Sequence, residues 1–305
     1  MTSESPTSAV PTSWWDDGRT LALLSATGFS LKAIFIKLAY ASGHVDAVTL
    51  LALRMGLAMP AFAWLALRAQ GSRLSRSDWL GVVALGLSGY YLSSLFDFLG
   101  LQHISAGLER LILFTYPTLV ILMEAAWHRK APSLRTWAAM GLCYVGLLAA
   151  FSHDIHYTGA TQAIWIGGGW VFLSSLSYST YFIGTGRFVK RLGSTRLTGY
   201  SGVAASGMVI AHYGLTRPLD SVFHMPPAAY GWGLALAAMS TVLPVWLAAR
   251  AVERMGPGKT AAMGTIGPVL TICFGWIILG EPFSWLQVVG LVFVVAGVSW
   301  VGRTK

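Results

Sequence analysis

Ten apolar runs, each about as long as a helix that crosses a bilayer, dominate this sequence of 305 residues. A transmembrane helix needs roughly 20 such residues, and the runs lack the two-residue alternation of membrane β-strands. Only 11% of the residues are charged, against about a quarter in soluble domains. The sequence therefore predicts an all-α polytopic membrane protein with ten transmembrane helices, at residues 20–40, 48–67, 79–99, 104–127, 136–151, 163–183, 199–215, 228–249, 261–279 and 285–301.

The basic residues indicate the direction of these helices. With ten spans, the connecting segments alternate between the two sides of the membrane, and 16 lysines and arginines then fall on one side, while Arg217 stands alone on the other. Short connections rich in Lys and Arg stay in the cytoplasm, so we expect a bacterial-type inner-membrane protein with both termini cytoplasmic. The same asymmetry accounts for the formal net charge of +9, and it removes the case for nucleic-acid binding.

The tail and the cysteines give no sign of redox or metal chemistry. Residues 1–18 are rich in Ser, Thr and Pro and are predicted to form a disordered cytoplasmic tail. Cys143 and Cys273 each lie inside an apolar run, which is typical of small buried side chains and not of a disulfide framework. We expect neither a metal nor any other cofactor.

Matching residues recur along the chain at two nearly equal offsets, 151 and 149 residues. The matches are Gly107 with Gly258, Pro117 with Pro268, Gly146 with Gly297, Ser25 with Ser174, Phe29 with Tyr178 and Ser30 with Ser179. Five spans per half is an odd number, so the second copy must enter the membrane from the opposite side. We predict two inverted five-helix repeats, residues 19–152 and 153–305, around a central cavity, the plan of many secondary transporters.

Two prolines interrupt corresponding helices. Pro117 lies in the fourth predicted span and Pro268 in the ninth, and each removes a backbone donor and clashes with the preceding turn. Interrupted helices at matching positions point to a transport site. We therefore predict that both prolines bend gating helices, the alternative being kinks that the fold simply tolerates.

The stretch from residue 256 to residue 300 resembles the second half of an EamA-type transporter of the drug/metabolite transporter superfamily. The resemblance rests on Gly258, Pro268, Gly297 and the segment GWIILGEP at residues 275–282. The first half resembles the same repeat through Lys37 and through Leu53 and Arg54, but it departs at Arg129, Lys130 and Ala131, which stand in place of Gly280, Glu281 and Pro282. Within the superfamily, the chain is most similar to the YddG-type exporters of aromatic amino acids. This resemblance implies ten helices, with spans 1, 3, 4, 6, 8 and 9 around the cavity and spans 5 and 10 at the periphery.

Several ionisable residues lie inside predicted spans, where each charge costs at least ~2.5 kcal/mol near the helix centre. At a rise of 1.5 Å per residue, one group falls in the periplasmic half of the membrane. We predict that its members form a structural ion network or extend to the membrane surface; they are Lys37, Arg54, Asp97, Glu109 and Arg110.

Lys32 lies near the middle of the first span, and no acid is evident at its depth. It shares one helix face with a serine and an aromatic residue, and a similar face recurs in the sixth span. Hydroxyls, aromatic rings and one ammonium suit a zwitterion with an apolar side chain. The predicted substrate-binding residues are Ser25, Phe29, Lys32, Tyr90, Ser174, Tyr178 and Tyr181, with Tyr90 included because Gly86, one turn away, leaves room. In the alternative interpretation, Lys32 is structural and the rings are packing.

The predicted function is export of small metabolites by alternating access, most specifically of amino acids with hydrophobic or aromatic side chains. The alternatives are export of other metabolites or cationic drugs, a channel, or a remote intramembrane serine protease, for which Ser88 in the G-x-S-G pattern would be the nucleophile and His212 or His103 the base. The expected partners are a small-molecule substrate and the lipid bilayer, and the expected state is a monomer or weak homodimer. We do not expect an enzyme.

Overall fold

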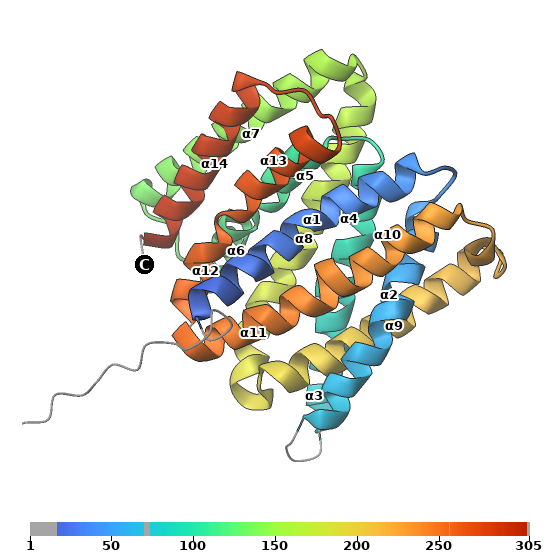
Figure 1. The fold of residues 1–305 in the computed structure, drawn as a ribbon. Helices are drawn as coiled ribbons and strands as arrows, with labels where there is room; N and C mark the ends of the chain where they lie inside the picture. The colour runs from blue at the N-terminus through green and yellow to red at the C-terminus, as the bar shows by residue number, and fades with distance from the viewer. Residues whose placement is uncertain (1–16, 70–73, 256, 304–305) are drawn as a thin grey trace, which may run out of the picture.

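A computed structural model describes residues 17–69, 74–255 and 257–303, and all regular structure in those ranges is helical (Figure 1). The elements of the first half are α1 (Gly18–Ala41), α2 (Ala47–Arg68), α3 (Arg76–Leu85), the π-helical η2 (Gly86–Leu92), α4 (Ser93–Leu101), α5 (Ala106–Leu113), α6 (Tyr116–His128) and α7 (Leu134–Thr158). Those of the second half are α8 (Thr161–Leu192), α9 (Ser194–Thr216), the 3₁₀ turn η3 (Ser221–Phe223), α10 (Pro227–Ala237), the π-helical η4 (Ala238–Val242), α11 (Leu243–Met255), α12 (Pro257–Gly264), α13 (Gly267–Ile278) and α14 (Trp285–Arg303).

Side-chain caps set where most helices of the first half begin. Each cap residue has an extended or turn backbone, and its oxygen accepts a hydrogen bond from one of the free N–H groups of the first turn. These residues are Asp17, Asp46, Ser75, Ser105 and Ser133. Because Asp17 caps α1, the first helix begins at Gly18, while the rest of the predicted tail lies outside the described residues.

Within the described residues, six helical segments are long and apolar enough to cross a membrane. They are Gly18–Ala41, Ala47–Arg68, Arg76–Leu101, Ala106–His128, Leu134–His156 and Pro227–Val252. Gly267–Ile278 and Trp285–Trp300 are apolar but shorter, whereas α8 and α9 are long and rich in Gly, Ser and Thr. The multi-pass, all-helical class is confirmed, and the count of ten spans stays a prediction.

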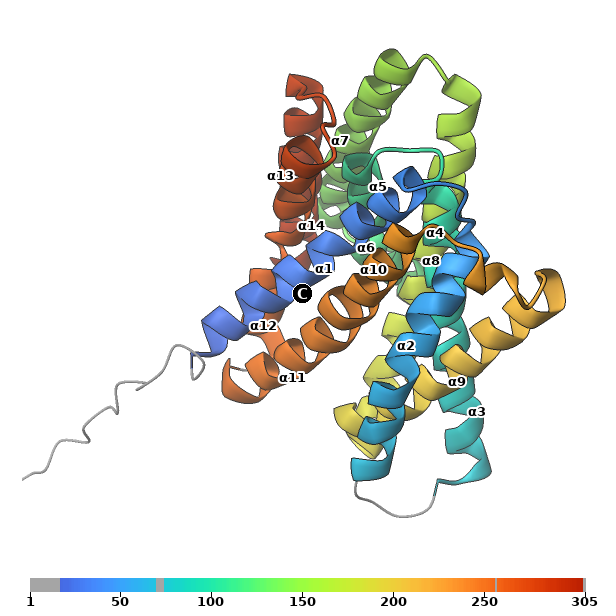
Figure 2. The same cartoon turned by 45° about the vertical axis from the view of Figure 1, so that its right-hand side comes forward.

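The order of elements in the first half recurs in the second, with helix starts at a constant offset. The starts of α3, α5, α6 and α7 at residues 76, 106, 116 and 134 correspond to those of α10, α12, α13 and α14 at residues 227, 257, 267 and 285, all 151 residues later. In both halves a π-helical stretch, η2 or η4, divides the third helical segment, and a short break divides the fourth. The broken pair α12–α13 lies beside α1 (Figures 1 and 2), and the broken pair α5–α6 contacts α8.

Glycines let α7 and α14 approach closely at one side of the bundle (Figure 1). A methyl group on Gly146 would lie 2.6 Å from the carbonyl oxygen of Gly290, and one on Gly290 would lie equally close to that of Gly146. Gly297 meets Ala139 of α7 in the same way. These glycines serve a contact within the chain, which leaves them no evident role in the weak homodimer predicted from the sequence.

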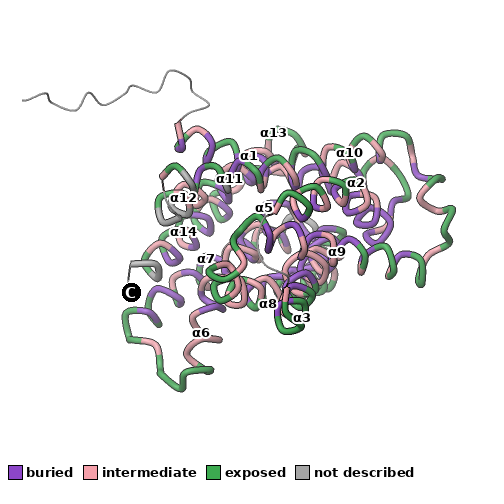
Figure 3. The backbone as a smooth tube through the Cα atoms, turned by 90° about the horizontal axis from the view of Figure 1, so that it is seen from below, coloured by how far each residue is buried: buried purple, intermediate pink, exposed green. Residues whose placement is uncertain are grey.

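The largest buried cluster joins α1, α2, α4, α9 and α10, and a second joins α5, α7, α8, α13 and α14. Figure 3 shows buried segments turned toward the middle of the bundle, while exposed apolar residues cover much of the outside. Exposed apolar side chains are expected of helices whose solvent is lipid. The two clusters meet where α1 contacts α5 and α13 and where α4 contacts α8.

Candidate functional site

Lys32 has two acidic partners, contrary to the expectation that it had none. Its Nζ lies 2.8 Å from Oδ2 of Asp97 on α4 and 3.4 Å from Oε1 of Glu109 on α5. Asp97 and Glu109 are 1% and 0% exposed, whereas the Lys32 side chain is 17% exposed. The ammonium therefore compensates two buried carboxylates. The depth comparison missed this pairing because it compared backbone positions along each helix and left out the reach of the long lysine side chain.

Arg54 and Lys37, the other cations of the predicted network, lie at different places. Arg54 is buried; its Nε donates to Thr241 Oγ1 at 2.9 Å and an Nη donates to Ser94 Oγ at 3.2 Å. Its guanidinium also lies 5.6 Å from the ring centre of Phe98. Lys37 instead lies within electrostatic range of Glu281 and Asp154 near the ends of α13 and α7. The predicted network is thus two groups of charges, and Asp97 and Glu109 belong to the group that holds Lys32.

Arg110 is the cation of the predicted network whose buried Nε has no hydrogen-bond acceptor. Within the described ranges it forms no ion pair, although its charge acts on the carboxyl group of the adjacent Glu109. A methyl group on Gly267 would lie 2.7 Å from a terminal nitrogen of its guanidinium, so Arg110 reaches the break between α12 and α13. Its charge also acts on the hydroxyl groups of Tyr116 and Tyr178. The sequence analysis gave Lys32 the unpaired role, but the geometry gives it to Arg110.

A continuous row of aromatic rings crosses the bundle beside Arg110. Tyr90 lies edge-on to Tyr181 at 5.5 Å, with their hydroxyl oxygens 3.4 Å apart, and Tyr181 lies 5.6 Å from Tyr178. The structure therefore brings together these three predicted tyrosines. Sequence reasoning missed the two ends of the row, where Phe62 lies 5.9 Å from Tyr90 and Tyr116 lies 5.1 Å from Tyr178. Tyr116 and Gly267 are the first residues after the two helix breaks, and they are 151 residues apart. Because Tyr116 directly precedes Pro117, as Gly267 directly precedes Pro268, the repeat offset could have singled out Tyr116 in the sequence.

The glycine that makes room for this row is Gly89. A side chain there would run into the ring of Tyr181. Gly86, which the sequence analysis chose, instead lets α9 approach, since a methyl group on it would lie 2.7 Å from the carbonyl oxygen of Ser201. The reason given for including Tyr90 was therefore wrong, because the space beside Gly86 is filled by the backbone of α9 and not by a tyrosine ring.

The two predicted serines are engaged with backbone groups. Ser25 is 4% exposed, and its hydroxyl donates to the carbonyl oxygen of Pro244 at 2.8 Å. Ser174 is fully buried, and its hydroxyl donates to the carbonyl oxygen of Ser93 at 2.7 Å. Each acceptor comes just after a π-helical segment, where backbone carbonyls lose their regular partners. Phe29, on the same helix as Ser25, is half-buried.

Both predicted gating prolines stand at the start of the helix that follows a break, which is a position proline favours. Pro117 is the second residue of α6 and Pro268 the second of α13. The break before α6 places Arg110 and Tyr116 on opposite sides of a turn, and the break before α13 presents Gly267 to Arg110. Glu281, in the loop after α13, accepts a 2.7 Å hydrogen bond from the backbone N–H of Ala106 at the start of α5.

The arrangement around Ser88 does not support a protease. The Ser88 hydroxyl donates to the carbonyl oxygen of Ala84 at 2.9 Å within its own helix. His212 bonds instead to the hydroxyl of Tyr91, at 3.0 Å. A serine nucleophile requires a base within hydrogen-bond reach, and His212 is occupied elsewhere.

Comparisons with known proteins agree with a transporter. The sequence profile of the EamA-like transporter family matches residues 18–152 and again residues 165–303. The chain is 32% identical over 298 residues to the uncharacterized transporter YcbK of Bacillus subtilis, with 93% of each chain covered. It is 26% identical over 227 residues to the threonine/homoserine exporter RhtA of Salmonella typhimurium, covering 73% of this chain and 71% of RhtA.

Two further similarities are more distant. The chain is 24% identical over 246 residues to an S-adenosylmethionine/S-adenosylhomocysteine transporter of Chlamydia trachomatis, covering 77% of this chain and 72% of that one. One solved structure, 17% identical, superposes with a TM-score of 0.62 over 94% of this chain and 96% of its own, which shows a shared fold. With both segments of its profile matched, this chain belongs to the EamA-like transporter family and is a membrane transporter, not an enzyme.

Proposed function

We propose that the protein exports amino acids with hydrophobic or aromatic side chains by alternating access, as the YddG-type resemblance suggests. In this proposal, residues 19–152 and 153–305 form inverted five-helix repeats of an inner-membrane protein with cytoplasmic termini. The substrate lies between Arg110 and the row of rings formed by Phe62, Tyr90, Tyr181, Tyr178 and Tyr116.

The unpaired guanidinium of Arg110 is the observation that carries the proposal. Arg110 is half-buried, and its Nε is buried without a hydrogen-bond acceptor. A guanidinium in such a place calls for an anion, because desolvating a charge without a partner is costly. A carboxylate bound by the planar guanidinium would gain charge-assisted hydrogen bonds. The position of Arg110 over the break before Gly267 favours the same role, because a bound carboxylate would also link two broken helices.

The balance of charge around Arg110 favours an anionic group too. Lys32, Arg54 and Arg110 are cationic, while Asp97 and Glu109 are the acids among them. This group of five side chains therefore has one more formal positive charge than negative charges, and a single carboxylate would neutralise it. The ammonium of a zwitterion would be met by tyrosine faces and hydroxyls, and an aromatic side chain by edge-to-face contacts with the same rings.

The substrates named for two relatives share this chemistry. Threonine, homoserine, S-adenosylmethionine and S-adenosylhomocysteine each carry an α-amino group and an α-carboxylate. The side chains of the first two are small and those of the S-adenosyl compounds are large, which supports recognition of the zwitterion by charged groups and of the remainder by a variable wall. In this chain that wall is aromatic, which is why we extend the proposal to hydrophobic and aromatic amino acids.

Uptake into liposomes by the purified protein tests the proposal. The panel comprises phenylalanine, threonine, and phenethylamine, which keeps the ring and ammonium of phenylalanine but lacks the carboxylate. Arg110→Gln should weaken the apparent affinity for phenylalanine ~10- to 100-fold, the cost of a lost charge-assisted contact, and should leave phenethylamine unchanged. Arg187→Gln, at an exposed position, is the control.

Each alternative outcome identifies a different transporter. Transport of phenethylamine and cationic dyes without any amino acid would replace the proposal by cationic drug export. Equal loss of both substrates in Arg110→Gln, with folded yield preserved, would mean that Arg110 does not bind the carboxylate.

A further inference from the structure

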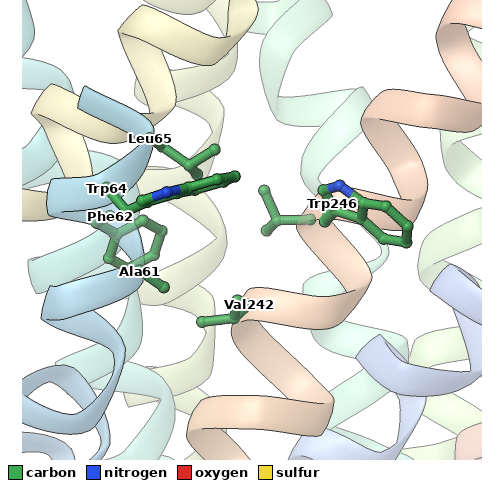
Figure 4. Close-up of a pocket in the computed structure, with 7 residues that line it drawn as sticks. Ala61, Phe62, Trp64, Leu65, Val242 and Trp246 are labelled. Carbon is green, nitrogen blue, oxygen red and sulfur yellow. The ribbon is translucent and has the colours of Figure 1, made fainter. Parts of the chain in front are cut away.

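An apolar cavity lies between α2 and the η4–α11 segment. It has about 360 Å³ of empty space including its open mouth, and it is lined by Phe62, Trp64, Leu65, Val242, Val245 and Trp246. Figure 4 shows the α2 residues on one side of the gap and Val242 and Trp246 on the other. Without a polar side chain to hold an ammonium or a carboxylate, this cavity does not suit a zwitterion.

The two tryptophans that border the cavity are incompletely covered by the chain. Trp64 is 52% exposed and Trp246 is 43% exposed. An apolar surface of this size calls for an apolar occupant from outside. Since α2 and the Pro227–Val252 segment are both membrane-capable helices, the hydrocarbon of the bilayer is the occupant within reach.

Each tryptophan also carries an arginine one turn further along its helix. The guanidinium of Arg68 lies 5.2 Å from the ring centre of Trp64, and that of Arg250 lies 5.4 Å from the ring centre of Trp246. Neither arginine forms an ion pair with a carboxylate of the described residues. Both are exposed, so each of the two cavity-lining tryptophans carries a guanidinium group, one on α2 and one on α11.

We propose that this cavity is a binding site for an anionic phospholipid. An acyl chain occupies the space between α2 and α11, and the phosphodiester of the headgroup is held by Arg68 and Arg250. The apolar slot matches an acyl chain, and the basic residues match an anionic headgroup. The tryptophans between them are of the type enriched where the headgroups meet the hydrocarbon. Charge complementarity selects an anionic headgroup over a zwitterionic one, because the quaternary ammonium of phosphatidylcholine would face two like charges.

The site is tested by native mass spectrometry of the full-length protein released from micelles that contain equal amounts of phosphatidylglycerol and phosphatidylcholine. The wild type should retain phosphatidylglycerol selectively. Arg68→Gln and Arg250→Gln should each weaken its retention about five-fold, the effect of one basic residue near an anionic surface. Arg187→Gln is the matched control, since Arg187 stacks on Trp127 at 5.4 Å but does not border this cavity.

Thermal unfolding gives a second measurement that does not depend on ion transmission. Phosphatidylglycerol should raise the Tm of the wild type and of Arg187→Gln, but not that of the Arg68→Gln/Arg250→Gln double variant. Equal retention of the two lipids, or equal loss in Arg187→Gln, would overturn the proposal. Displacement of the lipid by a transported amino acid would also overturn it, because the cavity would then belong to the substrate route.

Discussion

The Ser30 hydroxyl of α1 shares its proton between two backbone carbonyl oxygens, that of Ala26 in its own helix at 2.7 Å and that of Gly267, the first residue of α13, at 3.0 Å. Its counterpart in the other half, Ser179 of α8, shares its proton in the same way between Ser175 of its own helix at 2.7 Å and Tyr116, the first residue of α6, at 3.2 Å. The two donors are 149 residues apart, and the acceptors Tyr116 and Gly267 are 151 residues apart. The first helix of each half thus contacts the broken helix of the other half at the residue that follows the break.

Loss of either serine hydroxyl should have the same effect. We expect Ser30→Ala and Ser179→Ala each to lower the free energy of unfolding by about 1 kcal/mol, since each removes one hydrogen bond to a buried carbonyl. Both should also change the transport rate in the same direction. Ser152→Ala is the control, because its hydroxyl bonds only within an exposed turn of α7. Opposite effects of the two variants on transport would contradict equivalent roles for the two breaks.

The helix breaks themselves are tested by replacing their prolines. In Pro117→Ala and Pro268→Ala, a residue that disfavours a continuous helix by about 3 kcal/mol is gone, so each broken pair can merge into one helix. We expect the transport rate to fall in both variants while the folded yield is kept. Pro60→Ala should leave transport near the wild-type rate, because Pro60 lies inside the unbroken α2. Equal rates in all three variants would show that the breaks do not gate.

The all-helical membrane class was predictable because apolar length is a property of the sequence alone. The offset of 151 that pairs Pro117 with Pro268 also pairs the starts of α6 and α13. The site was less predictable, because side-chain partners depend on how neighbouring helices pack. Asp97 on α4 and Glu109 on α5 meet Lys32 on α1, and no periodicity argument within one helix includes a partner on another helix.

The same limit explains why the tyrosines were predicted better than the serines. Tyr178 and Tyr181 share a face of one uninterrupted helix, so the 3.6-residue period places them correctly. Ser25 and Ser174 share the predicted faces as well, but carbonyl groups released by π-helical segments capture their hydroxyls. Whether a hydroxyl faces a cavity or a backbone oxygen is decided by the neighbouring helix.

Lys32→Met distinguishes a structural lysine from a substrate-binding one. The variant leaves the buried carboxylates of Asp97 and Glu109 without a counter-ion. Removing one partner of a buried ion pair typically lowers the free energy of unfolding by about 3–5 kcal/mol. We expect transport of phenylalanine and of phenethylamine to fall together with the folded yield. Adding Asp97→Asn and Glu109→Gln to the variant should restore the yield. Selective loss of phenylalanine in a well-folded Lys32→Met protein would instead place the substrate carboxylate at Lys32.

Arg129→Gly should stabilise the protein. Arg129 ends α6 in the left-handed conformation, with φ of 52°, and its equivalent in the second half is Gly280, with φ of +67°. A residue with a Cβ costs about 1 kcal/mol there relative to glycine, so we expect a higher midpoint of chemical or thermal unfolding by about that free energy. Lys130→Gly, which removes the same charge one residue later, should destabilise or be neutral. An equal gain in both variants would attribute the effect to charge.

The pH dependence of stability tests the contact made by Glu281. Burial raises the pKa of the Glu281 carboxyl, and the hydrogen bond from the N–H of Ala106 offsets this only in part. A carboxyl whose pKa is higher in the folded than in the unfolded protein stabilises the fold fully below the unfolded value of about 4.3, and that contribution is lost as the pH rises through the folded pKa. The Tm of the wild type should therefore fall between pH 5 and pH 8 more steeply than that of Glu281→Gln, whose amide oxygen still accepts from Ala106 but does not titrate. Asp46 predicts the opposite sign: its burial is outweighed by hydrogen bonds from Thr49 and Arg217, which lower its pKa, so its contribution is lost only on acidification toward pH 3. Parallel Tm curves for the wild type and Glu281→Gln would mean that the contact at the start of α5 does not depend on the charge of Glu281.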